Sequence, residues 1–225
     1  MPRGPHSAAP SFARTAAAYE RSRPGYAPAA VAYLVEQLDL APGRVVLDLG
    51  AGTGKLARQL VSSGARVVAV EPLAEMRALV PAGIEALPGT AEAIPLPDAS
   101  VDAVTVAQAF HWFDEDAARA EMRRVLRPGG ALALVSNRRD ETDALTRAFG
   151  ETLARHRAHP PLEPLPSGRA FPHVRRVDSF ADLAESESSI AMLEGEAHAA
   201  ALADFAALGG GELHYVTYVE IEPDG

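Results

Sequence analysis

The chain of 225 residues contains no cysteine. This absence excludes disulfides, thiolate nucleophiles and zinc or iron–sulfur centres held by cysteine. No apolar run reaches the roughly 18 to 20 residues that a membrane-spanning helix needs, and the first residues lack the apolar stretch of a secretory signal. We therefore expect a cytoplasmic protein with no membrane partner.

Positive charge is also scarce. The 21 Lys and Arg residues are outnumbered by 30 Asp and Glu residues, which gives a formal net charge of −9. This balance argues against a broad nucleic-acid-binding surface. Seven histidines are present, but their spacing is not typical of metal ligands, and we expect no metal site.

The remaining composition, 48% hydrophobic and 23% charged, is typical of a globular protein. Short apolar runs alternate with segments of helical spacing. The expected strands cover residues 44–49, 65–70, 84–87, 102–107, 131–135, 174–180 and 213–221. The expected helices cover residues 29–38, 55–62, 73–79, 115–126, 143–157 and 196–208, with a turn at 127–130 and a Pro-rich loop at 159–172. This alternation predicts one α/β domain over residues 1–225, with a mostly parallel sheet and helices on both faces.

A glycine-rich loop holding Gly50, Gly52 and Gly54 follows the first expected strand. Glycines at such a turn let the backbone bend sharply and expose the amides of a helix N-terminus to a ligand. A phosphate-binding P-loop is excluded, because Leu49 and Leu56 stand where that motif needs glycine and Ser or Thr. A dinucleotide-binding loop stays open as a variant, although its third glycine would stand one residue after Gly54.

The run Asp-Leu-Gly-Ala-Gly-Thr-Gly at residues 48–54 resembles motif I of the class I S-adenosylmethionine-dependent methyltransferases. Glu71 ends the second expected strand, where a carboxylate can accept both hydroxyls of a ribose. NAD-binding proteins also carry an acidic residue there. Glu71 therefore predicts a ribose site without choosing between the two cofactors.

Three later segments favour the methyltransferases. Residues 89–102 resemble the family's adenine-side loop, and residues 126–130 resemble its turn before the fifth strand. Gln-Ala-Phe-His-Trp-Phe at 108–113 resembles the loop after strand four in the methyltransferase type 11 branch that includes trans-aconitate methyltransferase-like proteins. The resemblance covers residues 12–137. It implies a Rossmann-like, doubly wound, mostly parallel seven-stranded sheet with an antiparallel last strand.

The resemblance also implies S-adenosyl-L-methionine as cofactor and S-adenosyl-L-homocysteine as product. The residues expected to bind the cofactor are Tyr19, Arg23, Asp48, Gly50, Ala51, Gly52, Glu71, Pro72, Met76, Thr90, Ala91, Glu92 and Gln108. Asp48 would orient the glycine loop, reach the amino group of the cofactor through water, or cap the turn. Met76 would pack on adenine or in the core. Thr90 replaces the Asp of many relatives, so the adenine amino group would depend more on the Ala91 amide and on Glu92.

Residues 1–28 resemble the lid of this family. In that lid Tyr19 would cover the sulfonium with its ring and Arg23 would bind the methionyl carboxylate, with surface packing as the alternative for both. The Pro-rich segment 156–173 is expected near the methyl acceptor. His111 is the candidate general base, because the imidazole pKa lies near neutrality; a positioning role and a core hydrogen bond are the alternatives.

These features predict a methyltransferase that acts on an O, N or C nucleophile of a small molecule. Two other functions stay open. One is a protein of this fold that binds the cofactor for other chemistry or as a scaffold. An NAD-dependent oxidoreductase is disfavoured, because Lys55 is the sole lysine and forms no Tyr-x-x-x-Lys pair. The acceptor and the oligomeric state are not determined by the sequence.

Overall fold

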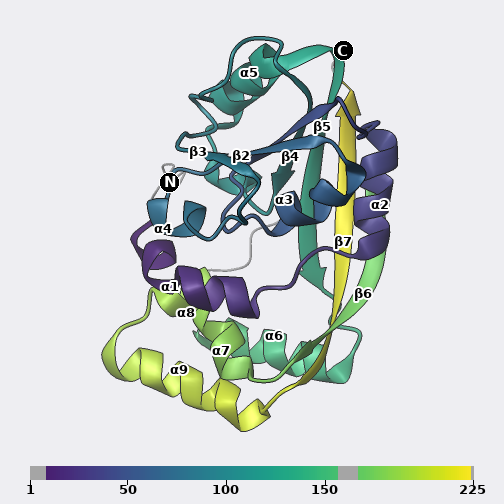
Figure 1. Cartoon of the computed structure of the whole chain (residues 1–225). Helices are drawn as coiled ribbons and strands as arrows, with labels where there is room; N and C mark the ends of the chain where they lie inside the picture. Colours follow the sequence, from purple (N-terminus) through teal and green to yellow (C-terminus); the bar gives the residue numbers. More distant parts are fainter. Residues whose placement is uncertain (1–8, 157–166, 224–225) are drawn as a thin grey trace.

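The computed structural model describes residues 9–156 and 167–223, and within them seven strands form one sheet in the order β3-β2-β1-β4-β5-β7-β6 (Figure 1). The strands are β1 (Val45–Leu49), β2 (Arg66–Val70), β3 (Glu85–Leu87), β4 (Val101–Ala107), β5 (Leu126–Arg139), β6 (Arg169–Val177) and β7 (Gly211–Pro223). Strands β1 to β5 are parallel, and β7 is antiparallel to β5 and β6. The predicted Rossmann-like, mostly parallel sheet with an antiparallel last strand is confirmed.

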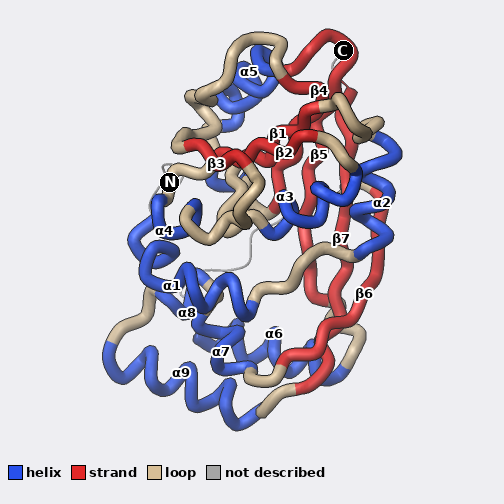
Figure 2. Tube along the Cα trace, in the orientation of Figure 1, coloured by secondary structure: helices blue, strands red, loops and turns tan. Residues whose placement is uncertain are grey.

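The helices of the described part of the chain surround this sheet (Figure 2). They are α1 (Ala9–Ser22), α2 (Pro28–Gln37), α3 (Lys55–Leu60), α4 (Ala74–Arg77), α5 (Glu115–Val125), α6 (Ala144–His156), α7 (Phe180–Glu185), α8 (Ser188–Ala191) and α9 (Gly195–Leu208), with 3₁₀ turns η1 (Val61–Ser63) and η2 (Phe110–Trp112). None of these described helices has the length and apolarity needed to cross a membrane.

The sheet is buried on both faces. On one face α2 and α3 pack against alternate residues of the central strands, among them Val46 and Ala103. On the other face α5 packs against the residues in between, among them Leu47 and Val104. Because successive strand residues point to opposite faces, burial on both sides accounts for the nearly continuous apolar run of β1.

A third apolar cluster lies beyond the carboxyl ends of the parallel strands. There α6, α7 and α9 pack around the buried rings of Phe149, Phe180 and Phe205. Helix α1 contacts α4, α7 and α8, and these helices gather on one side of the sheet (Figure 1). They cover the edge at which open α/β sheets bind ligands.

Three features differ from the sequence expectations. Residues 127–130 form an irregularity inside β5, at a register shift against β4, and not a separate turn. Strand β6 begins at Arg169, so the last part of the predicted Pro-rich loop is strand; residues 157–166 of that loop lie outside the described residues. Pro172 is tolerated in β6 because this strand is at the edge of the sheet. Helices α1, α7 and α8 were not predicted.

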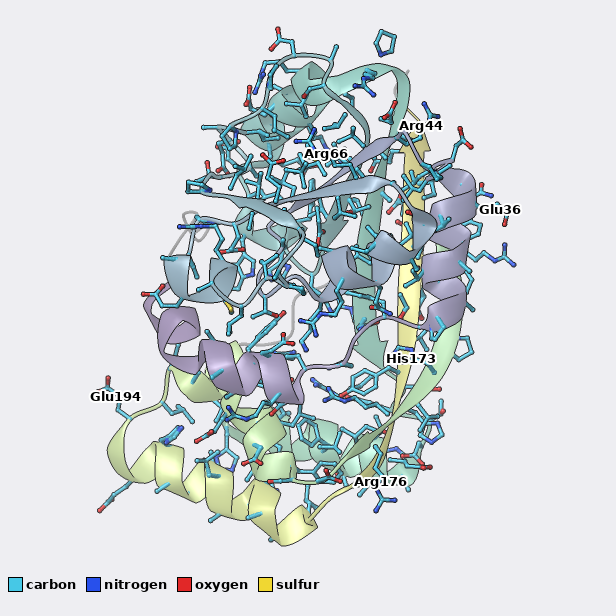
Figure 3. The ribbon with its side chains drawn as sticks, in the orientation of Figure 1. Glu36, Arg44, Arg66, His173, Arg176 and Glu194 are labelled. Carbon is cyan, nitrogen blue, oxygen red and sulfur yellow. The ribbon has the colours of Figure 1, made fainter. Side chains whose placement is uncertain are left out.

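Asp102 joins three strands at the amino end of the sheet, opposite α7 and α9; Figure 3 shows its partner Arg44 at this end. Its carboxylate accepts hydrogen bonds from the Val45 amide at 2.7 Å, from Arg44 at 3.0 Å and from Arg127 at 2.7 Å. Burial alone would raise the pKa of Asp102. The hydrogen bonds and the two guanidinium charges outweigh burial, so the pKa is lowered.

We expect Asp102→Asn to destabilise the fold by about 2 kcal/mol, because the new amide turns a donor toward an arginine. The two partner arginine side chains are 41% and 42% exposed, so solvent screening keeps the loss below that of a fully buried pair. Urea unfolding at pH 7 measures it. Asp98→Asn is the matched control: Asp98 pairs with Arg124 at 2.7 Å but is 79% exposed, and its loss should stay below about 0.5 kcal/mol. Equal losses would contradict the anchoring role of Asp102.

Candidate functional site

A cavity of about 360 Å³ lies at the carboxyl ends of β1, β2 and β4, under α1. In the sheet order, β1 stands between β2 and β4, so the chain leaves β1 in one direction and later returns on its other side. Ligands of open α/β sheets bind at such a switch point. The predicted site residues on the cavity wall are Tyr19, Arg23, Gly50, Ala51, Gly52, Glu71, Pro72, Met76, Thr90, Ala91, Glu92, Gln108 and His111.

The glycine loop forms the floor of the cavity. Gly50 and Gly52 have φ angles of 67° and 57°, which only glycine adopts without strain. A Cβ at Gly50 would stand 2.7 Å from the Cβ of Ala109, so the loop after β4 packs directly against it. A Cβ at Gly52 would meet no atom within 4 Å. Gly50 is thus required by packing, whereas Gly52 leaves open space beside the backbone.

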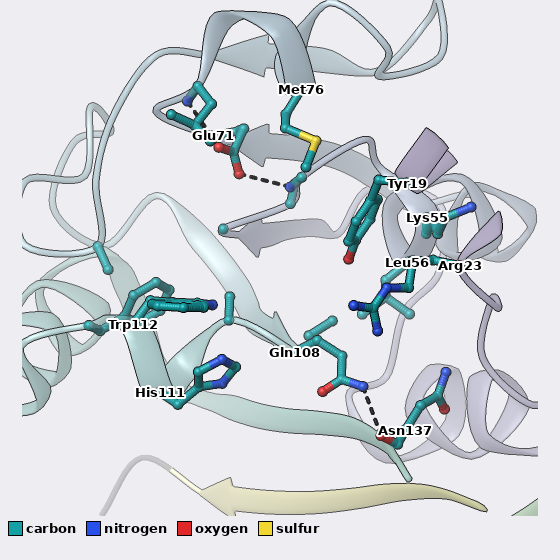
Figure 4. Close-up of a pocket in the computed structure, with 18 of the residues that line it drawn as sticks. Tyr19, Arg23, Lys55, Leu56, Glu71, Met76, Gln108, His111, Trp112 and Asn137 are labelled. Carbon is teal, nitrogen blue, oxygen red and sulfur yellow. Dashed lines mark hydrogen bonds between the residues drawn. The ribbon is translucent and has the colours of Figure 1, made fainter. Parts of the chain in front are cut away.

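Glu71, at the end of β2, holds this loop from the side. One carboxylate oxygen accepts a hydrogen bond from the Gly52 amide and the other from the Leu73 amide, both at 2.9 Å (Figure 4). The residue is 6% exposed, and burial raises the pKa of Glu71 although both amides and Arg77 oppose the shift. Met76 on α4 lies beside it on the cavity wall. The carboxylate therefore presents hydrogen-bond acceptors next to the open side of the loop.

Asp48 is the one predicted site residue that does not line the cavity. It is 1% exposed beneath the loop. Its carboxylate accepts from the Ala57 amide in the first turn of α3 at 3.0 Å and from the Thr105 hydroxyl at 3.2 Å. This is the capping arrangement that the sequence left open beside a contact with the cofactor through water. Burial raises the pKa of Asp48 to about 7 against the effect of both hydrogen bonds.

Gln108 and His111 follow β4. Gln108 has φ 57°, uncommon for a non-glycine residue, and its side-chain amide donates to the Asn137 carbonyl at 2.8 Å. The His111 ring is exposed to the cavity and lies 4.8 Å from the Trp112 ring, so it is not a core histidine. Enclosure by the cavity walls, followed by the Arg138 charge, lowers the pKa of His111 to about 4. The ring is therefore neutral at physiological pH.

The N-terminal segment is fastened over the cavity by polar contacts. Lys55, the first residue of α3, donates to the Glu20 carbonyl at 2.7 Å. The Asn137 side chain donates to the Gly25 carbonyl at 2.8 Å and accepts from the Thr217 hydroxyl at 2.6 Å. That hydroxyl also accepts from the Ala27 amide at 3.0 Å. Strands β5 and β7 thus fix the segment that links α1 to α2.

Several cavity residues were missed by sequence reasoning. They are Lys55, Asn137, Arg138, Arg139, Glu187 and Tyr215, among others. Asn137, Arg138 and Arg139 end β5, so the rule that ligands bind at the carboxyl ends of parallel strands could have selected them. Glu187 and Tyr215 come from the C-terminal third, and no spacing in the sequence connects them to the glycine loop.

Comparison with known proteins agrees with this geometry. A family model described as a methyltransferase domain matches residues 47–134. An uncharacterized methyltransferase of Mycobacterium tuberculosis is 54% identical over 149 residues, which cover 64% of this chain and 59% of the relative. The structure of a putative type II methyltransferase from Anaeromyxobacter dehalogenans superposes with a TM-score of 0.66 at 27% identity, covering 89% of this chain and 97% of that one. The chain thus resembles methyltransferases in sequence over residues 47–134 and in fold over most of its length.

The family of S-adenosylmethionine-dependent methyltransferases, which this chain resembles, implies S-adenosylmethionine as the cofactor. A demethylmenaquinone methyltransferase of Corynebacterium urealyticum is also similar, at 36% identity over 67% of this chain and 62% of that protein. The chain spans about three fifths of the length of the curated relatives it matches. Tyr19, Arg23 and Glu187 lie outside the 47–134 match, so the family model covers the glycine loop but not the lid.

We expect the stability of this protein to depend on pH through Asp48. Its folded-state pKa is raised to about 7 from 3.8, so folding takes up a proton, and the free energy of unfolding falls as pH rises from about 4 through 7. Asp48→Asn removes this effect, since its carbonyl can accept from Ala57 and its amide can donate to Thr105. The variant's stability advantage should widen by about 2 kcal/mol from pH 5 to pH 8 in urea unfolding. A pH-independent difference would contradict the shift.

Proposed function

We propose that this protein transfers a methyl group from S-adenosyl-L-methionine to an O, N or C atom of a small molecule. The observation that carries the proposal is the buried Glu71 carboxylate, which lies 2.9 Å from the Gly52 amide beside the open floor of the cavity. A ribose presents two hydroxyl donors, and a carboxylate is an acceptor only. The acceptor oxygens of Glu71 therefore suit the two ribose hydroxyls of the cofactor.

The walls around Glu71 fit the rest of the nucleoside. Met76 is buried on one side, and Ala91 is buried in the loop after β3. Both present apolar surface to a flat base. Glu92 adds a polar group on the same loop, although its carboxylate also accepts from the Asp114 amide at 3.0 Å. The adenine would thus lie between Met76 of α4 and the loop after β3, with its amino group toward Glu92.

When bound, the cofactor supplies an activated methyl group together with its own leaving group. The chain has to align the acceptor with that methyl group and to exclude water. Helix α1 and Tyr19 cover the cavity from one side. The cavity volume of about 360 Å³ falls within the range of small-molecule sites, which supports small-molecule ligands. The name of the demethylmenaquinone relative supports testing quinones among the candidates.

His111 is proposed to take the proton of the acceptor. Its ring faces the cavity near Gln108 (Figure 4), and its low pKa keeps the imidazole neutral and able to accept a proton at pH 7. An imidazole of such a low pKa is a weak base. The proposed role therefore suits an acceptor whose proton is lost as the methyl group arrives, because the developing positive charge lowers the pKa of the acceptor.

Calorimetric titration with S-adenosylhomocysteine tests the cofactor, with NADH as the parallel ligand. We expect micromolar binding of S-adenosylhomocysteine, weakened at least about tenfold by Glu71→Ala, because the ribose loses a buried charged acceptor. Glu75→Ala is the matched control, since Glu75 is an exposed carboxylate on the neighbouring helix α4, and it should bind as the wild type does. Binding of NADH in place of S-adenosylhomocysteine would overturn the proposal and restore an oxidoreductase.

Steady-state kinetics with an identified acceptor test His111. We expect His111→Gln to lower kcat about 100-fold with little change in the KM of the cofactor. Because the neutral ring is the active form and its pKa is about 4, the wild-type rate should fall only as pH drops toward 4, not near 6.5. His198→Gln on α9 serves as control. A change in kcat below threefold would assign His111 to positioning and not to proton transfer.

A further inference from the structure

The turn between α7 and α8 brings a buried carboxylate to the cavity from the C-terminal third of the chain. Glu187 lines the cavity and is 9% exposed. One of its oxygens lies 2.9 Å from Nη2 of Arg23, and the other lies 2.9 Å from Nη1 of Arg139. The lid, the end of β5 and the α7–α8 turn therefore meet at a single side chain.

The hydrogen bonds that hold Arg23 use the Nε and Nη2 atoms of its guanidinium group. Nε donates to the Ser186 carbonyl at 3.3 Å, and Nη2 donates to the same carbonyl at 3.0 Å and to Glu187. Among the described residues, none of these hydrogen bonds uses the third nitrogen, Nη1. Figure 4 shows the guanidinium inside the cavity, on the side of Gln108. Ser186 and Glu187 thus hold the planar group so that Nη1 can face the ligand space.

Charge keeps this arrangement in place. Burial alone would raise the pKa of Glu187, but the positive charges of Arg23 and Arg139 outweigh burial and lower it. The carboxylate is therefore ionised at neutral pH. Arg139 is fixed in turn, since its guanidinium lies 5.2 Å from the Phe149 ring centroid in the buried cluster of α6, α7 and α9. The contact with Arg139 therefore fixes Glu187, which in turn can orient Arg23.

We propose that Glu187 is a positioning residue that presents Nη1 of Arg23 to the methionyl carboxylate of the cofactor. This inference rests on the proposed function. A free arginine side chain loses much rotamer freedom when it binds an anion, and holding it in advance removes that loss from the binding step. The N–H groups of Nη1 can donate charge-assisted hydrogen bonds to a carboxylate. The cofactor site is then completed by residues 186–187, far outside the family match.

Two ligands separate this role from a structural one. S-adenosylhomocysteine carries the amino-acid part, whereas 5′-methylthioadenosine shares the nucleoside and the thioether but lacks the carboxylate. We expect Glu187→Gln to weaken S-adenosylhomocysteine about tenfold in calorimetry and to leave 5′-methylthioadenosine unchanged within about twofold. Glu222→Gln is the matched control, because it removes the carboxylate of another ion pair, with Arg119 at 2.6 Å, and Glu222 does not line the cavity. This variant should leave the affinity for both ligands unchanged.

A double-mutant cycle tests whether Glu187 acts through Arg23. Arg23→Gln should weaken the binding of S-adenosylhomocysteine but not that of 5′-methylthioadenosine. The double variant with Glu187→Gln should bind S-adenosylhomocysteine no more weakly than Arg23→Gln alone. Should Glu187→Gln fail to fold, Arg23→Lys is the second variant. Its ammonium keeps the charge but cannot bridge Ser186 and Glu187 while facing the ligand, so the same selective loss is expected.

The outcomes distinguish this inference from the proposed function. If the wild-type protein binds neither nucleoside ligand, the proposed function and the positioning role of Glu187 are both overturned. If it binds S-adenosylhomocysteine but Glu187→Gln weakens both ligands alike, or neither, the positioning role is overturned while the cofactor assignment stands. Additive losses in the double variant would also overturn it, because they would show that Glu187 affects the ligand independently of Arg23.

Discussion

The contact between the Glu71 carboxylate and the Gly52 amide is the interaction on which the organisation of the cavity depends. It joins the end of β2 to the loop that leaves β1, at the point where the sheet order reverses. Because the carboxylate is nearly buried, its charge is stabilised mainly by backbone amides. The loop is therefore fixed with its open glycine facing the ligand space, while Gly50 packs under the loop after β4.

The cavity has two parts of different origin. Its floor comes from the region of the family match, where short strand-to-helix connections position the backbone. Its cover comes from the N-terminal segment and the C-terminal third of the chain, and side-chain hydrogen bonds hold it in place. Thr217 and Asn137 fasten the segment after α1, and Glu187 fastens Arg23. These contacts depend on particular side chains, whereas the glycine loop contributes to the cavity through its backbone.

The distribution of charge inside the cavity differs from the average of the chain. The formal net charge is −9, yet Arg23 and Arg139 share a single carboxylate at the end of β5. Glu71 and Glu92 stand on the opposite side, after β2 and β3. Folding thus separates acidic from basic groups along the carboxyl edge of the sheet. Net charge limits the partners of the whole surface, but it does not describe a site that folding has enclosed.

The sequence by itself determined the sheet, the glycine loop and Glu71, because strand periodicity, turn glycines and a strand-end carboxylate are local signals. It did not determine that Asp48 caps α3 beneath the loop, since the choice depends on where Thr105 and Ala57 lie. It also did not reveal α1, α7 and α8. Only the tertiary structure decided that Glu187 meets Arg23 across 164 positions of sequence, because such a contact is set by helix packing beyond the sheet and leaves no spacing to read.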